Sequence, residues 1–190
     1  MRIEEWERRY RTRERASEDF SPSPTPLVAA ALAAVRAGRA LDLACGTGRN
    51  ALWLAQHDWQ VTAVDGAGSA IDALNSRARE AGLAIETQVA DLEKLEFAIE
   101  PNAWDAILDC YYLQRSLFPA IRAGVKPGGL AIVVVHITEP GEQPSYKRAA
   151  PGELRSYFND WDILHYREGA PEDPAHKRAA AELVARKPAP

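Results

Sequence analysis

The sequence contains few of the features on which secreted, membrane-spanning or nucleic-acid-binding proteins depend. Only 2 of its 190 residues are cysteines, too few for a disulfide framework and without the spacing of a zinc site, so we expect reduced thiols and no metal. No apolar run approaches the roughly 20 residues of a membrane helix, and residues 1–6 lack the apolar core of a signal peptide. The formal net charge is −4, without a long Lys and Arg run beyond the N-terminal segment. We therefore expect a cytoplasmic protein that binds a small molecule and has no nucleic-acid or membrane partner. The sequence leaves the oligomeric state open.

Short apolar stretches alternate with helical stretches along the chain. The predicted strands are 40–44, 60–65, 84–90, 104–109, 130–137, 161–167 and 178–186, and the predicted helices are 2–16, 27–37, one directly after Gly48, 70–81, 113–123 and 151–158. This alternation predicts an α/β fold with a mostly parallel, doubly wound sheet. The last two strands should form a hairpin at the sheet edge, although the alanines at 179–181 favour a helix by propensity.

A glycine turn, Gly46 to Gly48, joins the strand 40–44 to an amphipathic helix. Glycine tolerates positive φ and lets the backbone approach a ligand closely. The free N–H groups at the start of the following helix suit a carboxylate or a phosphate. The turn therefore predicts a site for an anionic group.

Ligands of open α/β sheets bind at the carboxyl ends of the strands. The residues at those ends are 45–50, 65–68, 91–92, 109–112 and 136–138. Asp65 follows the glycine turn at the spacing of a carboxylate that accepts two ribose hydroxyls. Asp91 can accept a hydrogen bond from an adenine amino group, with Leu92 against the ring. Together they predict a bound adenosine.

Two cofactors combine an adenosine with a group at a glycine loop. Gly46, Gly48 and Ala51 satisfy the dinucleotide fingerprint, so an NAD(P)-dependent oxidoreductase of Rossmann type is one alternative. Asp42 is unfavourable so close to a pyrophosphate, but it attracts an ammonium or sulfonium cation. A non-catalytic cofactor-binding protein is the third alternative.

The same residues carry a family resemblance. The stretch Leu41–Gly48 resembles the first motif of class I S-adenosylmethionine-dependent methyltransferases, Val64–Asp65 their acidic second motif and Ala90–Leu92 their third. Lys126–Leu130 is similar to the turn that leads into their fifth strand. Four motifs in order make this match more specific than the glycine loop alone.

A fainter resemblance extends over the whole chain. Trp6–Tyr10, Gly48–Asn50 and the tail from Glu153–Phe158 to Ala185–Lys187 resemble the small tellurite-resistance and thiopurine-type methyltransferases. The family implies a seven-stranded sheet of order 3-2-1-4-5-7-6 with strand 7 antiparallel. Length and composition predict one domain, 1–190. Within it we expect a helical arm or lid with a proline-rich connector (1–38), a cofactor-binding core (39–137) and a C-terminal helix with edge strands (138–190).

The resemblance assigns S-adenosylmethionine, with S-adenosylhomocysteine as product, to a set of residues by position. These are Asp42, Ala44, Cys45, Gly46, Thr47, Gly48, Arg49, Asn50, Asp65, Gly66, Ala67, Asp91, Leu92 and Cys110. Gly46 and Gly48 would contact the methionine part, and Cys110 or Tyr111 would lie beside the sulfonium. Nothing about the acceptor follows from the family.

Methyl transfer to a small-molecule or oxyanion acceptor is an in-line displacement, in which the enzyme mainly aligns the reactants. A base is needed only where the acceptor loses a proton, and His136 and Tyr111 are the catalytic candidates. Tyr10, Arg13, Tyr111, Tyr112 and Arg115 are the candidates for a substrate pocket. Each has a structural alternative, namely core packing for the aromatic residues and surface ion pairs for the arginines. We expect His57, His165 and His176 to face solvent.

Overall fold

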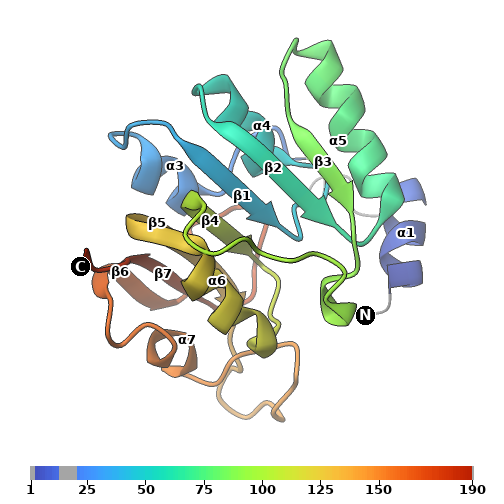
Figure 1. Ribbon diagram of the computed structural model, residues 1–190. Helices are drawn as coiled ribbons and strands as arrows, with labels where there is room; N and C mark the ends of the chain where they lie inside the picture. Colours follow the sequence, from blue (N-terminus) through green and yellow to red (C-terminus); the bar gives the residue numbers. More distant parts are fainter. Residues whose placement is uncertain (1–2, 13–20, 190) are drawn as a thin grey trace.

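The computed structural model describes residues 3–12 and 21–189 (Figure 1). Its centre is a seven-stranded sheet of order β3-β2-β1-β4-β5-β7-β6. The strands are β1 (Arg39–Leu43), β2 (Gln60–Asp65), β3 (Glu86–Val89), β4 (Trp104–Cys110), β5 (Val125–His136), β6 (Asp162–Gly169) and β7 (Ala180–Arg186). All neighbours from β3 to β5 pair in parallel, and β7 is antiparallel to both β5 and β6. The predicted sheet order and antiparallel seventh strand are confirmed.

The strand register places several carboxyl ends at one edge of the sheet. Leu43, the last residue of β1, lies opposite Val64 of β2 and Asp109 of β4. Because these strands are parallel, the loops after them leave the sheet side by side. The residues predicted to form a site are thereby brought together.

Helices cover both faces of the sheet, as the doubly wound prediction requires (Figure 1). Residues of α3 (Pro26–Leu32), α4 (Arg49–Gln56) and α5 (Gly68–Glu80) share one apolar cluster on one face. Residues of the 3-10 turns η1 (Leu92–Lys94) and η2 (Arg115–Leu117) and of helices α6 (Phe118–Gly124) and α7 (Glu153–Ser156) belong to the cluster on the other. Helix α1 (Ile3–Thr12) lies across the edge of the sheet where β2 and β3 end.

Several predicted boundaries differ from the structure. The helix expected at 27–37 ends at Leu32, because residues 33–36 are exposed, so another turn would bury little apolar surface. The helix expected at 113–123 begins only at Phe118, after η2, and the helix expected at 151–158 is reduced to α7. The predicted turn at 126–129 lies within β5, where the pairing with β4 shifts register. Residues 13–16 of the first predicted helix lie outside the described residues.

The alanines at 179–181 favour a helix in isolation, yet β7 is a strand between β5 and β6. Ala181, Leu183 and Ala185 are fully buried against the apolar cluster of α6 and α7. Tertiary packing therefore overrides helix propensity here, and the predicted terminal hairpin is confirmed. In the part of the chain that the structure describes, no helix combines the length and the apolar character needed to cross a membrane.

Candidate functional site

The loop between β1 and α4 has left-handed backbone at Ala44, Gly46 and Gly48, with φ values of 49°, 55° and 80°. A Cβ atom on Gly46 would lie 3.0 Å from Tyr10 Oη, and one on Gly48 would lie 2.2 Å from Leu74 Cδ1. Both positions thus need glycine, for conformation and for space. The loop returns the chain directly into α4, whose first N–H groups lie at the site edge of the sheet.

Asp65, the last residue of β2, organises the backbone around this loop. Its carboxylate accepts hydrogen bonds from the N–H groups of Gly46 and Ala67, each at 2.8 Å. Burial raises the pKa of Asp65, and these two hydrogen bonds oppose that rise. A carboxylate has about four acceptor positions, so Asp65 can still accept hydrogen bonds from a ligand.

Asp91 and Leu92 follow β3 at the same edge. The Asp91 carboxylate accepts from the N–H of Glu93 at 2.9 Å, which caps η1, and it pairs with Lys94 Nζ at 3.1 Å. Leu92 is 4% exposed and lines the cavity beside it. An acidic residue that caps η1 and an apolar side chain thus lie together, as an adenine site needs.

Helix α1 lies beside α5 (Figure 1), and its Tyr10 side chain reaches Gly46 of the glycine loop. The Glu7 carboxylate accepts hydrogen bonds from Ser69 Oγ and, at 2.9 Å, from Ser69 N in the first turn of α5. The Ser69 hydroxyl holds the pKa of Glu7 below its usual range. The carboxylate also lies at the positive end of the α5 dipole, so its charge favours this docking.

A cavity of about 410 Å³ lies between α1, the glycine loop and the strand ends. Its lining includes most of the residues predicted from the sequence: Tyr10, Ala44, Cys45, Gly46, Thr47, Arg49, Asp65, Gly66, Ala67, Asp91, Leu92, Cys110, Tyr111, Tyr112 and His136. Ligand pockets typically measure about 300–1,000 Å³. The predicted residues thus surround one space of suitable size.

An aromatic group closes the cavity at the end of β4 and β5. The His176 ring stacks on the Tyr111 ring with centroids 3.4 Å apart, and His136 lies 5.2 Å from Tyr111. Burial lowers the pKa of His136, and it lowers that of His176 to about 4, so both imidazoles are neutral at pH 7. Among the described residues, Tyr111 Oη and His136 Nδ1 are buried without a hydrogen-bond partner. His176 was expected to face solvent; that prediction is wrong, because its ring packs on Tyr111.

Arg49 joins the glycine loop to the segment before β7. Its guanidinium pairs with Asp173 at 2.6 Å and lies 5.7 Å from the centre of the Tyr111 ring. Asp173 in turn accepts from Ala175 N at 3.0 Å, which shapes the turn that presents His176. Burial works to raise the pKa of Asp173, but the hydrogen bond from Arg49 holds it below its usual range.

Both cysteines are free thiols and line the cavity, as expected for residues that follow neighbouring strands. Burial raises the pKa of the Cys45 and Cys110 thiols, so both stay protonated at neutral pH. Within the described residues, no three His, Cys, Asp or Glu side chains are grouped to hold a metal ion.

Some residues predicted for the site do not line the cavity. Asp42 is 1% exposed beneath the loop, and burial raises its pKa to about 7. Gly48 packs against Leu74, and the Asn50 side-chain oxygen accepts from Thr25 N at 2.8 Å, which anchors the proline-rich connector. These three residues are buried behind the residues that line the cavity.

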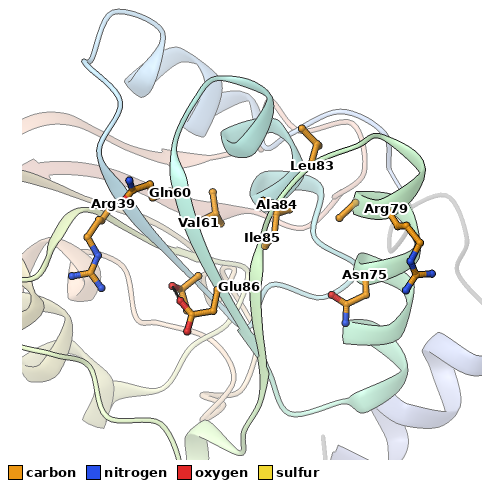
Figure 2. A pocket seen from close by; sticks show the side chains of 11 residues that line it. Arg39, Gln60, Val61, Asn75, Arg79, Leu83, Ala84, Ile85 and Glu86 are labelled. Atoms are coloured by element: carbon orange, nitrogen blue, oxygen red, sulfur yellow. Dashed lines mark hydrogen bonds between the residues drawn. The ribbon is translucent and has the colours of Figure 1, made fainter.

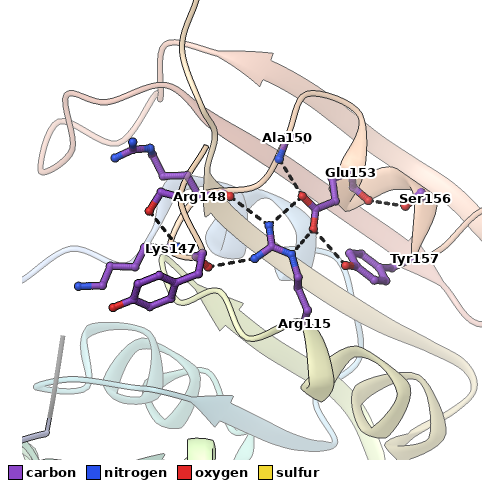
Figure 3. A network of polar contacts seen from close by, with 9 residues as sticks. Arg115, Lys147, Arg148, Ala150, Glu153, Ser156 and Tyr157 are labelled. Carbon is purple, nitrogen blue, oxygen red and sulfur yellow. Dashed lines mark hydrogen bonds and ion pairs between the residues drawn. The ribbon is translucent and has the colours of Figure 1, made fainter. Parts of the chain in front are cut away.

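Two arginines were predicted for a substrate pocket. Arg115 is not among the cavity residues, because its guanidinium binds Glu153 at 2.6 Å and two backbone carbonyls (Figure 3). Arg13 lies outside the described residues. The predicted pocket role of Arg115 is therefore corrected to a structural one.

Sequence reasoning missed Asp173, His176, Tyr146 and Lys147, of which the last three line the cavity. They lie in polar segments without periodicity, and Asp173 is 124 positions from its partner Arg49. Composition gave no signal either, because charged residues are frequent throughout the chain after β5. Their positions depend on how these segments fold back over the sheet.

A second hollow, of about 710 Å³, lies at the opposite edge of the sheet (Figure 2). Arg39 begins β1, Gln60 begins β2 and Glu86 begins β3, and Asn75 and Arg79 of α5 form its other side. It contains no loop that follows a parallel strand and none of the predicted site residues. The candidate site is therefore the cavity beneath α1.

The sheet order and the position of the cavity define the fold of the class I S-adenosylmethionine-dependent methyltransferases. Among solved structures with this fold is 1,6-didemethyltoxoflavin-N1-methyltransferase from Burkholderia thailandensis. It has a TM-score of 0.74 at 17% identity and covers 98% of this chain and 87% of its own.

The chain belongs to the TehB family, because residues 19–181 match the family model described as tellurite resistance protein TehB. A probable S-adenosyl-L-methionine-dependent methyltransferase TehB from Haemophilus influenzae is 31% identical over 144 residues, which are 70% of this chain and 49% of that protein. The crystal structure of TehB from Haemophilus influenzae has a TM-score of 0.73 at 28% identity and covers 84% of this chain and 61% of its own. The chain thus spans about half the length of the curated relatives it matches. The resemblance to the tellurite-resistance methyltransferases is confirmed.

Proposed function

We propose that this chain is an S-adenosylmethionine-dependent methyltransferase that acts on a small anionic acceptor. The observation that carries the proposal is the single cavity in which the glycine loop, Asp65 and Asp91 meet. Membership of the TehB family favours this function over an NAD(P)-dependent oxidoreductase. The family's description makes tellurite the first acceptor to test.

The residues present fit the cofactor. Asp65 keeps acceptor positions for ribose hydroxyls, Leu92 offers an apolar surface to adenine, and Gly46, which has no side chain, lines the cavity where the methionine part would lie. When bound, S-adenosylmethionine would supply an electrophilic methyl group on a sulfonium. The cofactor end of the cavity carries Asp65, Asp91 and Glu93, which favours a cationic ligand.

The protein itself holds and orients the reactants and excludes water from them. Tyr111 has a left-handed backbone, with φ of 66°, and its N–H donates to Val134 O at 2.6 Å, so the backbone that carries the ring is held against β5. The Tyr111 hydroxyl and the neutral His136 imidazole are the groups that can accept or hold a proton there. Helix α1 covers the cavity and limits access of water.

The acceptor end has the opposite charge. Arg9, Arg49 and Lys147 line the cavity there, and the charge of Arg9 acts on His176. Asp173 neutralises Arg49, and Lys147 adds an ammonium group to the lining of the cavity. This arrangement supports an anionic acceptor. We place the protein in a reducing cytoplasm, in which both cysteines stay thiols.

Calorimetry with S-adenosylmethionine, S-adenosylhomocysteine and NAD tests the cofactor. We expect both sulfur compounds to bind and NAD to bind weakly or not at all. Methyl transfer from labelled S-adenosylmethionine to tellurite or selenite then tests the reaction. Binding without transfer to any of a broad acceptor panel would favour the non-catalytic alternative.

A further inference from the structure

The segment 146–150, which follows β5, contributes two side chains to the mouth of the cavity although it has no regular structure. Tyr146 and Lys147 both line the cavity, and Tyr146 is 71% exposed. Packing of these side chains in the core therefore does not hold them in place. Their position depends on the backbone that carries them.

Arg115 binds that backbone directly (Figure 3). Its guanidinium donates to Tyr146 O at 3.0 Å and to Arg148 O at 3.2 Å. The same group forms hydrogen bonds of 2.6 and 3.0 Å with the Glu153 carboxylate. One planar fork of five N–H donors can make all four contacts, which a lysine cannot.

Glu153 closes the other side of the segment. One of its oxygens accepts from Ala150 N at 2.7 Å, and the other accepts from Tyr157 Oη at 3.1 Å. Burial works to raise the pKa of Glu153, but the hydrogen bond from Arg115 holds it below its usual range. Three backbone groups of the segment thus depend on one ion pair.

The segment is also joined to the end of β5. Ala149 N donates to His136 O, and Thr138 N donates to Ala149 O, both at 2.9 Å. A shift of the segment would therefore be felt at His136 as well as at Lys147.

We propose that Arg115 is a positioning residue that, with Glu153, clamps the 146–150 segment so that Lys147 faces the anionic acceptor. The inference rests on the proposed function for the identity of the acceptor. Arg115 itself stays outside the cavity and acts through the backbone of residues 146–150.

The test compares Arg115→Gln, Arg115→Lys, Lys147→Gln and the double variant Arg115→Gln/Lys147→Gln. The affinity of tellurite for the protein saturated with S-adenosylhomocysteine is measured by calorimetry, and the exchange of the Ala149 and Ala150 amides by mass spectrometry or NMR. Arg122→Gln is the matched control, because Arg122 also bridges a carboxylate, Asp160, and a backbone carbonyl but lies away from the cavity.

We expect Arg115→Gln and Lys147→Gln each to weaken tellurite binding about tenfold, the scale of one charged hydrogen bond. The double variant should be no weaker than Lys147→Gln, since both changes act on one contact. Amide exchange should accelerate in Arg115→Gln, partly recover in Arg115→Lys and stay unchanged in Lys147→Gln. The affinity for S-adenosylhomocysteine should not change.

Wild-type exchange in Arg115→Gln, or losses of affinity that multiply in the double variant, would overturn the inference. Failure of tellurite, selenite and phosphate to bind the wild-type protein would also overturn it, while S-adenosylhomocysteine binding would leave the methyltransferase proposal intact. Conversely, absence of S-adenosylhomocysteine binding would overturn the proposed cofactor. Tellurite titration of the cofactor-free protein and its variants would then still test the role of Arg115 and Glu153.

Discussion

The Arg49 guanidinium and the Asp173 carboxylate form a 2.6 Å ion pair between the glycine loop and the segment that carries His176. Their side chains are 12% and 3% exposed. Two parts of the cavity that are distant in sequence, the cofactor loop and the acceptor wall, are therefore fixed to each other by one contact.

Breaking this pair should destabilise the fold. Arg49→Met leaves the Asp173 charge buried without its partner, which should lower the free energy of unfolding by about 3 kcal/mol. Urea unfolding measures the change. Arg178→Met is the control, because the Arg178 pair with Glu142 is more exposed (41% and 28%) and its loss should cost much less. Equal losses in the two variants would contradict a buried role for Arg49.

The same pair gives stability a defined pH dependence. The folded pKa of Asp173 lies below its unfolded value, so its contribution is present above the unfolded pKa and is lost as pH falls through the folded pKa. Arg49→Met should therefore lose more stability relative to wild type at pH 7 than at pH 3. Urea unfolding at both pH values measures the difference, and a pH-independent difference would show that the two charges do not interact.

Asp42 should act in the opposite direction. Its folded pKa of about 7 lies above the unfolded value of about 3.9, so the native state binds more protons and stability falls as pH rises between them. Asp42→Asn removes this titration and should gain, from pH 4 to pH 8, on the order of 4 kcal/mol relative to wild type. Unfolding curves at a series of pH values provide the measurement. Asp72→Asn, the same substitution at an exposed position of α5, is the control.

Asp65 should matter for cofactor affinity. Asp65→Ala removes the acceptor for ribose hydroxyls and frees the N–H groups of Gly46 and Ala67, so S-adenosylhomocysteine binding should weaken by about 1.5–3 kcal/mol. Calorimetry measures the dissociation constant. Asp72→Ala is the control on the neighbouring helix, and unchanged affinity in Asp65→Ala would show that the ribose contact is misassigned.

Glu7 should control the cover over the cavity. Glu7→Gln weakens the charged hydrogen bonds to Ser69, so α1 should undock more often and S-adenosylhomocysteine affinity should fall about fivefold. Amide exchange in residues 3–12 should accelerate in parallel. Glu4→Gln, at an exposed position of the same helix, should change neither quantity. Faster exchange without loss of affinity would mean that α1 does not retain the ligand.

The sequence predicted the features that depend on local chemistry. The glycine loop, Asp65 and Asp91 each follow a short apolar strand, and the strand order places them around one cavity. Periodicity and turn residues are sufficient for this because every parallel strand delivers its next loop to the same edge.

The contacts between distant segments could not be read in the same way. His176 lies in a polar segment whose path depends on Arg49 and Asp173. Arg115 was predicted for the pocket, but its partners are Tyr146, Arg148 and Glu153, which are distant in sequence. Helix ends depended on burial, as at Leu32, which no local pattern specified. Packing and long-range pairing decided these cases.

The antiparallel strand β7 also constrains how the molecule forms. In the described chain β6 pairs only with β7, and β7 occupies the edge of β5. Residues 162–169 therefore cannot add to the growing sheet until residues 180–186, which come later in the chain, have docked. The final third of the fold should assemble as one cooperative event that waits for its last strand, and β6 should separate whenever β7 does.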